Sequence, residues 1–320
     1  IESFPHKATL NQEIALHKLA EFIVDKPSDT VFILKGYAGT GKTTIIGTLV
    51  KNLWKKFQSA VLLAPTGRAA KVMSNYSGRE ASTIHRLIYY PKVGRSGLEF
   101  TLKKNKSKNT VFIVDEASMI PDRDTSGQLF NTNSLLDDLI TYVDSGQNCK
   151  LILIGDTAQL PPVGLEMSPA LDRTTFEHYY NRDVIEVELS EVVRQEADSG
   201  ILYNATEIRD KIQDGFYKHL KLKIEEFPDK NSEETAFIVR SNKRANLYNQ
   251  NIRSRVLLQE NELSTGDQLM VVKNNYFWLK PTSEAGFIAN GDIIEVLRIK
   301  SFKDLYGFRF AEVEVRMVDY

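Results

Sequence analysis

Short runs of consecutive apolar residues recur along the first half of the chain. They lie at 31–34, 60–64, 111–114 and 151–154, separated by polar and helix-forming segments. Strands buried on both faces of a parallel sheet have this continuous apolar character, and their alternation with helices is typical of a doubly wound α/β fold. We expect one helix before the first run, over 10–24, and another from 43 to about 53.

The pattern changes in the last third of the chain. A further strand-like run at 235–239 and a helical segment at 242–257 are followed by three strand-like runs at 267–272, 291–299 and 308–317. Turn signals, Asn290-Gly291 and Tyr306-Gly307, lie among these runs. The sequence therefore predicts an α/β domain over 1–193 and a second domain over 194–320, with a small β-rich part over about 266–320.

A glycine-rich segment links the first apolar run to the next helix. It reads Gly36-Tyr37-Ala38-Gly39-Thr40-Gly41-Lys42-Thr43, which fits G-x-x-x-x-G-K-[ST] between a strand and a helix. The loop amides and the helix N-terminus can cradle phosphates, Lys42 can reach the β- and γ-phosphates, and the Thr43 hydroxyl can bind Mg²⁺. We therefore predict a site for ATP and Mg²⁺. The candidate nucleotide-binding residues of this loop are Gly39, Thr40, Gly41, Lys42, Thr43 and Thr44.

Two carboxylates follow the third apolar run. Asp115 and Glu116 come directly after 111–114, at the carboxyl end of a predicted parallel strand, where open α/β sheets bind ligands. Asp115 is the candidate Mg²⁺ holder, and Glu116 is the candidate base that deprotonates the attacking water. The pair indicates hydrolysis because it accompanies a phosphate-binding loop.

Composition narrows the class of protein. The chain has 320 residues, a net charge of −1, a single cysteine (Cys149) and no histidines at zinc-site spacing. There is no membrane-length apolar stretch and no secretory pattern, so we expect a cytoplasmic enzyme without disulfides. The basic cluster over 103–108 is either a solvated loop or a nucleic-acid contact.

Further motifs follow in a fixed order. They are Ala64-Pro65-Thr66-Gly67-Arg68-Ala69-Ala70, then Ser82-Thr83-Ile84-His85, then Gly155-Asp156-Thr157-Ala158-Gln159, and finally Leu189-Ser190-Glu191-Val192-Val193-Arg194-Gln195. With the phosphate loop and Asp115-Glu116, this series resembles superfamily 1 DNA helicases of the Dda- and RecD-like branch. The resemblance is continuous over 9–195 and looser over 237–253.

The resemblance implies two RecA-like domains, the second incomplete, and an SH3-like β-rich part. It also implies an ATP-dependent helicase or translocase that moves 5′→3′ on single-stranded DNA, with a role in DNA repair or recombination. It assigns Gln12 to the adenine edge, although Gln12 also fits a capping box with Thr9. It assigns Gln159 to the γ-phosphate and its attacking water, and Arg194 to the charge of the transition state.

For the polynucleotide, the motif after the second strand suits phosphate contacts, and the histidine after Ser-Thr-Ile is a further candidate. The candidate contacts with single-stranded DNA are Thr66, Gly67, Arg68 and His85.

A β-hairpin is expected between His85 and the Asp-Glu strand, over about 88–108, with its turn at 94–97. In Dda-like helicases such an insertion acts as the pin at which duplex strands part. Phe100 is the candidate stacking aromatic, and inward packing is the alternative reading of this residue.

Two motifs of the branch, a Gln-Gly-x-[ST] stretch and a Thr-Arg stretch, do not occur before Tyr320. We therefore expect a piece of a longer helicase that binds ATP without unwinding by itself. The alternatives are an ATP-switched module that binds DNA or a partner, and a RecD-like subunit of a recombination nuclease complex. The expected partners are single-stranded DNA and duplex junctions, and the expected state is a monomer.

Overall fold

The computed structural model of the chain describes residues 4–94, 97–121, 134–162, 164–191, 241–275 and 287–318, together with 208, 239, 278 and 279. Contacts between residues divide the chain into two compact units, Ile1–Gln195 and Glu196–Tyr320. Arg194 and nearly all of the strand predicted over 235–239 lie outside the described residues.

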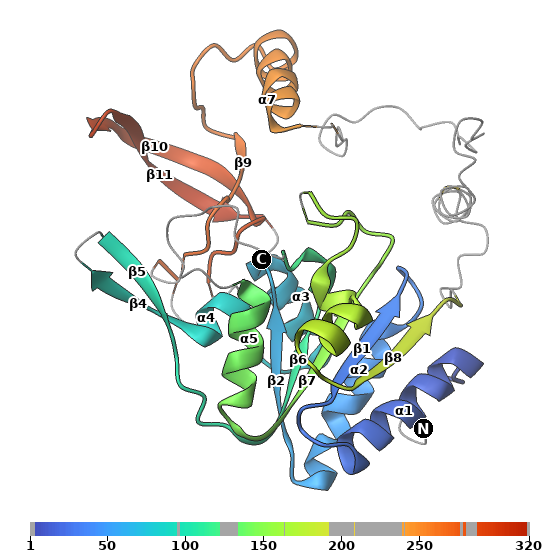
Figure 1. The fold of residues 1–320 in the computed structure, drawn as a ribbon. Helices are drawn as coiled ribbons and strands as arrows, with labels where there is room; N and C mark the ends of the chain where they lie inside the picture. The colour runs from blue at the N-terminus through green and yellow to red at the C-terminus, as the bar shows by residue number, and fades with distance from the viewer. Residues whose placement is uncertain are drawn as a thin grey trace. The chain divides into compact units, whose positions relative to one another are not determined.

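A parallel sheet forms the centre of the first unit (Figure 1). Within the described residues it has six strands in the order β3-β2-β6-β7-β1-β8. Their bounds are Val31–Gly36 (β1), Ser59–Ala64 (β2), Ala81–Thr83 (β3), Lys108–Val114 (β6), Gln147–Gly155 (β7) and Val184–Leu189 (β8). The predicted parallel α/β sheet is confirmed, and all four apolar runs are strands of it. The strand β8 was not predicted, because Glu186 and Glu188 interrupt the apolar run at this edge of the sheet.

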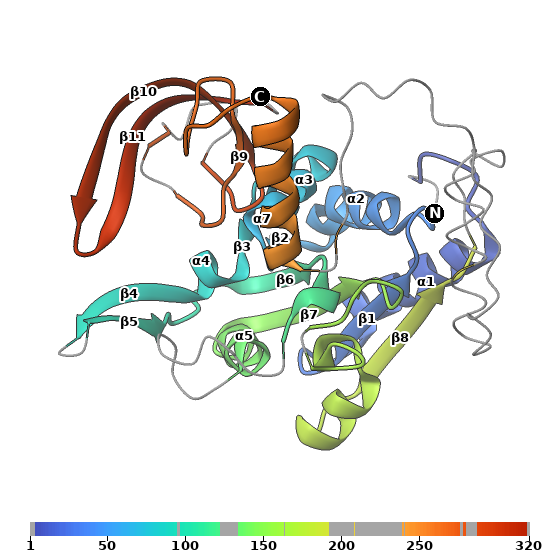
Figure 2. The ribbon, with the colours of Figure 1, turned by 90° about the horizontal axis from the view of Figure 1, so that it is seen from above.

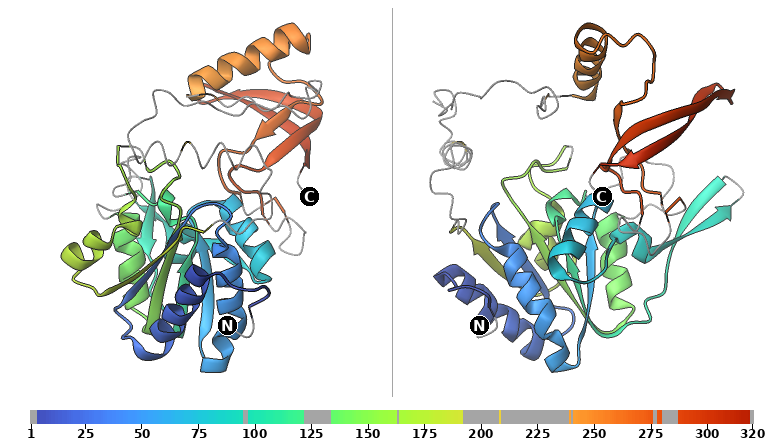
Figure 3. Two further views of the ribbon diagram at one scale, coloured as in Figure 1. Left: turned by 90° about the vertical axis from the view of Figure 1, so that its right-hand side faces the viewer. Right: turned by 180° about the vertical axis from the view of Figure 1, so that it is seen from behind.

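Helices cover both faces of the sheet. Phe32 and Leu34 face a core that includes α1 (Leu10–Asp25), α2 (Lys42–Asn52) and α3 (Gly67–Ser77). Val31 and Ile33 face the opposite core, with α4 (Ile84–Ile88) and α5 (Leu135–Asp144). Figures 2 and 3 show these layers from above and from the side. Alternate residues of β1 are thus buried on opposite faces, which explains its continuous apolar sequence.

Both ends of α1 are fixed by side chains. At its start, Gln12 N donates to Thr9 Oγ1 at 3.4 Å and Thr9 N donates to Gln12 Oε1 at 3.1 Å, which confirms the capping box. At its end, Lys150 Nζ donates to the carbonyls of Phe22 and Lys26, both at 2.6 Å. Burial lowers the pKa of Lys150, and the helix carbonyls compensate part of that cost.

The predicted hairpin is present between α4 and β6. Its strands, β4 (Tyr89–Gly94) and β5 (Gly97–Leu102), form a separate antiparallel pair in which Gly94 lies opposite Gly97. Within this register Phe100 lies opposite Pro91, in the half of β5 away from the turn.

The second unit contains the predicted β-rich part. Its described residues form α7 (Asn242–Asn251), a π-helical turn (Ile252–Val256) and a three-stranded antiparallel sheet in the order β11-β10-β9. The strands are β9 (Gln268–Met270), β10 (Ile293–Leu305) and β11 (Phe308–Met317). Tyr306 and Gly307, with φ of 54° and 77°, form the predicted turn between β10 and β11. None of the described helices of the chain is long and apolar enough to span a membrane.

Candidate nucleotide-binding site

The carboxyl ends of three neighbouring strands bring their loops to one edge of the first unit's sheet. Lys35 of β1 pairs with Gly155 of β7, and Val114 of β6 pairs with Leu153 of β7. The phosphate loop, Asp115 and Asp156 therefore start side by side, and a cavity of about 400 Å³ lies among them. The cavity is lined by Phe4, His6, Lys7, Gln12, Tyr37, Ala38, Gly39, Gly41, Lys42, Thr43, Thr44, Asp115, Glu116, Asp156 and Gln159.

The phosphate loop depends on glycine where it enters α2. Gly41 has φ of 91° in the left-handed region, and it is the N-cap of the helix. An added Cβ at Gly41 would lie 2.4 Å from Gln12 Nε2. The positive φ therefore favours glycine at this position, and any larger residue would also displace the Gln12 amide.

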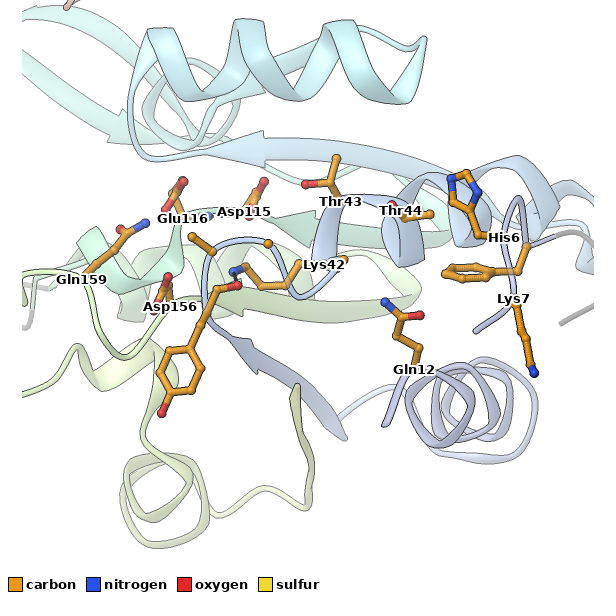
Figure 4. Close-up of a pocket in the computed structure, with 15 residues that line it drawn as sticks. His6, Lys7, Gln12, Lys42, Thr43, Thr44, Asp115, Glu116, Asp156 and Gln159 are labelled. Atoms are coloured by element: carbon orange, nitrogen blue, oxygen red, sulfur yellow. Dashed lines mark hydrogen bonds between the residues drawn. The ribbon is translucent and has the colours of Figure 1, made fainter. Parts of the chain in front are cut away.

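Lys42 lies in the middle of the cavity (Figure 4). Its Nζ donates to the carbonyls of Gly36 at 2.5 Å and Tyr37 at 2.9 Å. Burial lowers the pKa of Lys42, while the negative charges of Asp156, Asp115 and Glu116 oppose that shift. The ammonium group is thus bonded to two loop carbonyls and stabilised in its charged form by three nearby carboxylates.

Asp115 has a defined partner on each carboxylate oxygen. Its Oδ1 accepts from Glu116 N at 2.9 Å, and its Oδ2 accepts from the hydroxyl of Tyr76 at 2.9 Å. Burial and the charge of Asp115 raise the pKa of Tyr76, so the phenol remains a proton donor. Each carboxylate oxygen keeps a further lone pair for a water molecule or a cation.

Glu116 has an uncommon backbone conformation that directs it to the cavity. Its φ is 55° and its ψ is 35°, in the left-handed region that non-glycine residues rarely adopt. Burial raises the pKa of Glu116 and Asp115 adds to the shift, whereas a hydrogen bond from Gln159 and the charge of Lys42 lower it. Gln159 Oε1 accepts in turn from Ser118 Oγ at 3.2 Å. Glu116 and Gln159 therefore form one hydrogen-bonded group at this end of the cavity.

Gln12 lies at the opposite end of the cavity, near His6 and Lys7 (Figure 4). It is buried, and its Nε2 donates to the carbonyl of Thr40 at 3.0 Å. Because its Oε1 accepts from Thr9 N, the amide connects the start of α1 to the phosphate loop.

Sequence reasoning missed several residues of the lining. Asp156 follows a buried strand as Asp115 does, so the same signal was available for it. Phe4, His6 and Lys7 precede α1 in a segment without a motif, and no pattern marks them.

The oxygen donors around Lys42 fit a magnesium ion. Thr43, Asp115 and Asp156 contribute one hydroxyl and two carboxylates to the lining. The described residues contain no group of three His, Cys, Asp or Glu side chains that could hold a metal. This donor set suits Mg²⁺, which commonly binds one or two carboxylates together with water and substrate phosphates.

The predicted DNA residues at the start of α3 lie at the same edge of the sheet, directly after β2. Thr66 is the N-cap of α3, and its Oγ1 accepts from Ala69 N at 3.2 Å. The Thr66 hydroxyl hydrogen remains available as a donor in this arrangement. Gly67 is buried and Arg68 is exposed.

The other two DNA candidates, His85 and Phe100, each have a ring that lies near the ring of Tyr89. The half-buried His85 ring lies 5.8 Å from the Tyr89 ring, and the Phe100 ring lies 6.4 Å from it. Phe100 also packs against the core beside α5. These contacts favour a packing role for Phe100 in the described structure, and its role in strand separation stays a prediction.

Comparison with known proteins identifies a family and several relatives. The model of the AAA domain family matches residues 17–221. The Dda ATP-dependent DNA helicase of Enterobacteria phage T4 is 34% identical over 192 residues, which are 57% of this chain and 40% of that protein. The uncharacterized protein R530 of Acanthamoeba polyphaga mimivirus is 32% identical over 177 residues, 48% of this chain and 33% of that protein.

The ATP-dependent RecD2 DNA helicase of Deinococcus radiodurans is 34% identical over 131 residues, 41% of this chain and 16% of that protein. The chain thus spans between 16% and 40% of the length of these three relatives. The family match covers more than half of the chain and includes the phosphate loop, Asp115 and Gln159. The chain therefore belongs to the AAA domain family, and its resemblance to superfamily 1 helicases of the Dda- and RecD-like branch is confirmed.

Proposed function

We propose that this chain carries the ATP site of an ATP-dependent DNA helicase that translocates on single-stranded DNA. The observation that supports this most is the cavity in which Lys42, Asp115, Glu116 and Gln159 meet beside the phosphate loop. The Dda and RecD2 relatives, both named as ATP-dependent DNA helicases, support DNA as the substrate. Movement in the 5′→3′ direction follows from the resemblance to this branch.

The two ends of the cavity suit the two ends of a nucleotide. The base would lie toward Gln12 and His6, and the γ-phosphate toward Glu116 and Gln159, with Lys42 on the β- and γ-phosphates between them (Figure 4). Gly39, Thr40, Gly41 and Thr44 complete the nucleotide-binding loop in this proposal.

Thr43 and Asp115 would hold Mg²⁺, which neutralises charge on the β- and γ-phosphate oxygens when it is bound. Glu116 would accept the proton of the attacking water, and the Gln159 amide, bonded to Glu116, would orient that water. Arg194, assigned from its motif, would stabilise charge on the γ-phosphate.

The DNA strand would contact the start of α3. The Thr66 hydroxyl, the backbone at Gly67 and the Arg68 guanidinium are suitable phosphate donors there, and His85 is a further candidate contact. Contacts of this kind bind the backbone of the strand and read no base sequence.

Glutamate 116 provides the test of this function. The Glu116→Gln variant should bind ATP with Mg²⁺ as the parent does while hydrolysis falls by about 10²–10⁴-fold, the range expected for loss of a general base. Hydrolysis by the parent should also increase when single-stranded DNA is added. The Glu177→Gln variant is the control, because Glu177 is paired with Arg173 on the surface and is absent from the cavity lining.

Equal hydrolysis by Glu116→Gln and the parent would show that Glu116 is not the base. Binding of ATP without turnover in either protein, together with ATP-dependent DNA affinity, would instead favour an ATP-switched DNA-binding module.

A further inference from the structure

One hydrogen bond connects the proposed strand-binding helix to the ATP cavity. The hydroxyl of Tyr76, in the last turn of α3, donates to Asp115 Oδ2 at 2.9 Å. Tyr76 is half-buried and packs against the core on this face of the sheet. The tyrosine does not line the cavity, so it reaches the nucleotide site through Asp115.

This bond determines how Asp115 is oriented. The Asp115 Oδ1 bond comes from the next residue in the chain, Glu116 N, and moves with the loop itself. The Oδ2 bond comes from another element of secondary structure, so it fixes the carboxylate relative to α3. A hydrogen bond to an ionised oxygen is stronger than one between neutral groups, which makes Tyr76 an effective partner.

The helix that carries Tyr76 is a continuous unit with a defined start and end. It is capped by Thr66 at its start and by Gly78 at its end, where Gly78 N donates to Ser74 O. Its 11 residues span roughly 16 Å at 1.5 Å per residue. Thr66, Gly67 and Arg68, the proposed phosphate contacts, are thus joined to Tyr76 through one short helix.

We infer that Tyr76 is a positioning residue that transmits strand binding at the start of α3 to Asp115, the residue proposed to hold Mg²⁺. The inference rests on the proposed function, because it needs a nucleotide in the cavity and a strand on α3. It predicts that a bound DNA strand changes the Mg²⁺ concentration that the protein needs to bind nucleotide. The Tyr76 hydroxyl should be required for that change.

The test is a titration of Mg²⁺ at a fixed concentration of a fluorescent ADP analogue, with and without a poly(dT) oligonucleotide, in which nucleotide binding is the readout. For Tyr76→Phe we expect the Mg²⁺ concentration at half-maximal binding to rise about tenfold without DNA, the change expected when a charged oxygen loses a hydrogen bond. The oligonucleotide should lower this concentration in the parent and should have no effect on it in Tyr76→Phe.

The matched control is Tyr180→Phe. Tyr180 also donates its hydroxyl to a carboxylate, Asp137 Oδ1 at 2.6 Å, but neither residue lines the cavity. This variant loses the same kind of bond, so its Mg²⁺ titration should match that of the parent. Thermal melting of both variants separates a general loss of stability from a local effect at the site.

The outcomes distinguish the inference from the proposed function. Unchanged Mg²⁺ dependence in Tyr76→Phe would overturn the positioning role. An equal response to DNA in Tyr76→Phe and the parent, or no response in the parent, would overturn the transmission. Absence of nucleotide binding by the parent at any Mg²⁺ concentration would instead refute the proposed function itself.

Discussion

At the scale of single residues, Gln12 gives the sharpest prediction. Its amide oxygen is bonded to Thr9 N and its amide nitrogen to Thr40 O, so one N–H remains to contact a base. That N–H can donate to N7, an acceptor that adenine and guanine share. We therefore expect Gln12→Ala to weaken binding of ADP and GDP by the same factor, because the variant loosens the phosphate loop in both cases.

Fluorescence competition with the two nucleotides measures this factor. The ratio of the two affinities in the parent protein is the internal reference. A loss confined to ADP would show that Gln12 selects adenine, as the resemblance implies, and that its two hydrogen bonds rearrange when the base binds.

The sequence predicted some residues of the cavity and missed others for a physical reason. Lys42 was predicted from the phosphate-loop motif, and Asp115 because it follows an apolar strand directly; a parallel sheet brings the carboxyl ends of its strands to one edge. Tyr76 was not predicted, since its partner is 39 residues away and the contact depends on how α3 lies on the sheet. Phe4 was missed because only the tertiary fold brings the segment before α1 to the cavity.

At the scale of elements, substitutions at two glycines test how closely the end of β7 packs against the segments that contain Ser118 and Leu171. An added Cβ at Gly155 would lie 2.5 Å from Leu171 Cδ1 and 3.0 Å from Ser118 N, whereas one at Gly47 would meet no atom within 4 Å. We expect Gly155→Ala to lower the free energy of unfolding by about 1–3 kcal/mol, as overpacking does. Gly47→Ala, inside α2, should raise it by roughly 0.5–1 kcal/mol, because alanine favours the helix.

Urea denaturation of the two variants and the parent gives these differences. The Gly47→Ala variant is the control for the extra methyl group itself. Equal stability of Gly155→Ala and the parent would show that Leu171 and the turn at Ala117–Met119 can move aside without cost.

Helix α3 allows a second prediction at this scale. If Arg68 binds a DNA phosphate, Arg68→Ala should weaken binding of single-stranded DNA for all base sequences. The slope of log affinity against log salt concentration should fall by about 0.7, the value for one phosphate contact on a single strand. Arg79, exposed just beyond the other end of α3, is the matched control, and Arg79→Ala should leave the slope unchanged. Titrations at several salt concentrations measure both slopes, and an unchanged slope for Arg68→Ala would remove this residue from the strand-binding surface.

The elements themselves differ in how well the sequence predicted them. The buried strands β1, β2, β6 and β7 were found because their runs are continuously apolar. The strand β3 was missed because three residues are too few for a pattern, and β8 because its glutamates break the run. The β4–β5 hairpin was predicted from the glycines at its turn.

At the scale of the whole molecule, the nucleotide cavity belongs to one unit. Its lining runs from Phe4 to Gln159, and both hydrophobic cores described for the parallel sheet end before Gln195. In the part of the chain that the structure describes, the hydrophobic cores that support the phosphate loop, Asp115 and Gln159 therefore lie in the first unit.

This location leads to a prediction about the first unit alone. A protein of residues 1–195 should fold and bind an ADP analogue within about threefold of the 320-residue chain, a difference below roughly 1 kcal/mol. We propose that stimulation by single-stranded DNA also needs residues of the second unit, so hydrolysis by the shorter protein should not respond to the strand. Fluorescence titration and a phosphate-release assay on the two proteins measure these properties.

A loss of affinity of about tenfold or more in the shorter protein would show that the second unit holds the nucleotide directly. Full stimulation by DNA in the shorter protein would show that α3 and the cavity suffice to link the strand with hydrolysis.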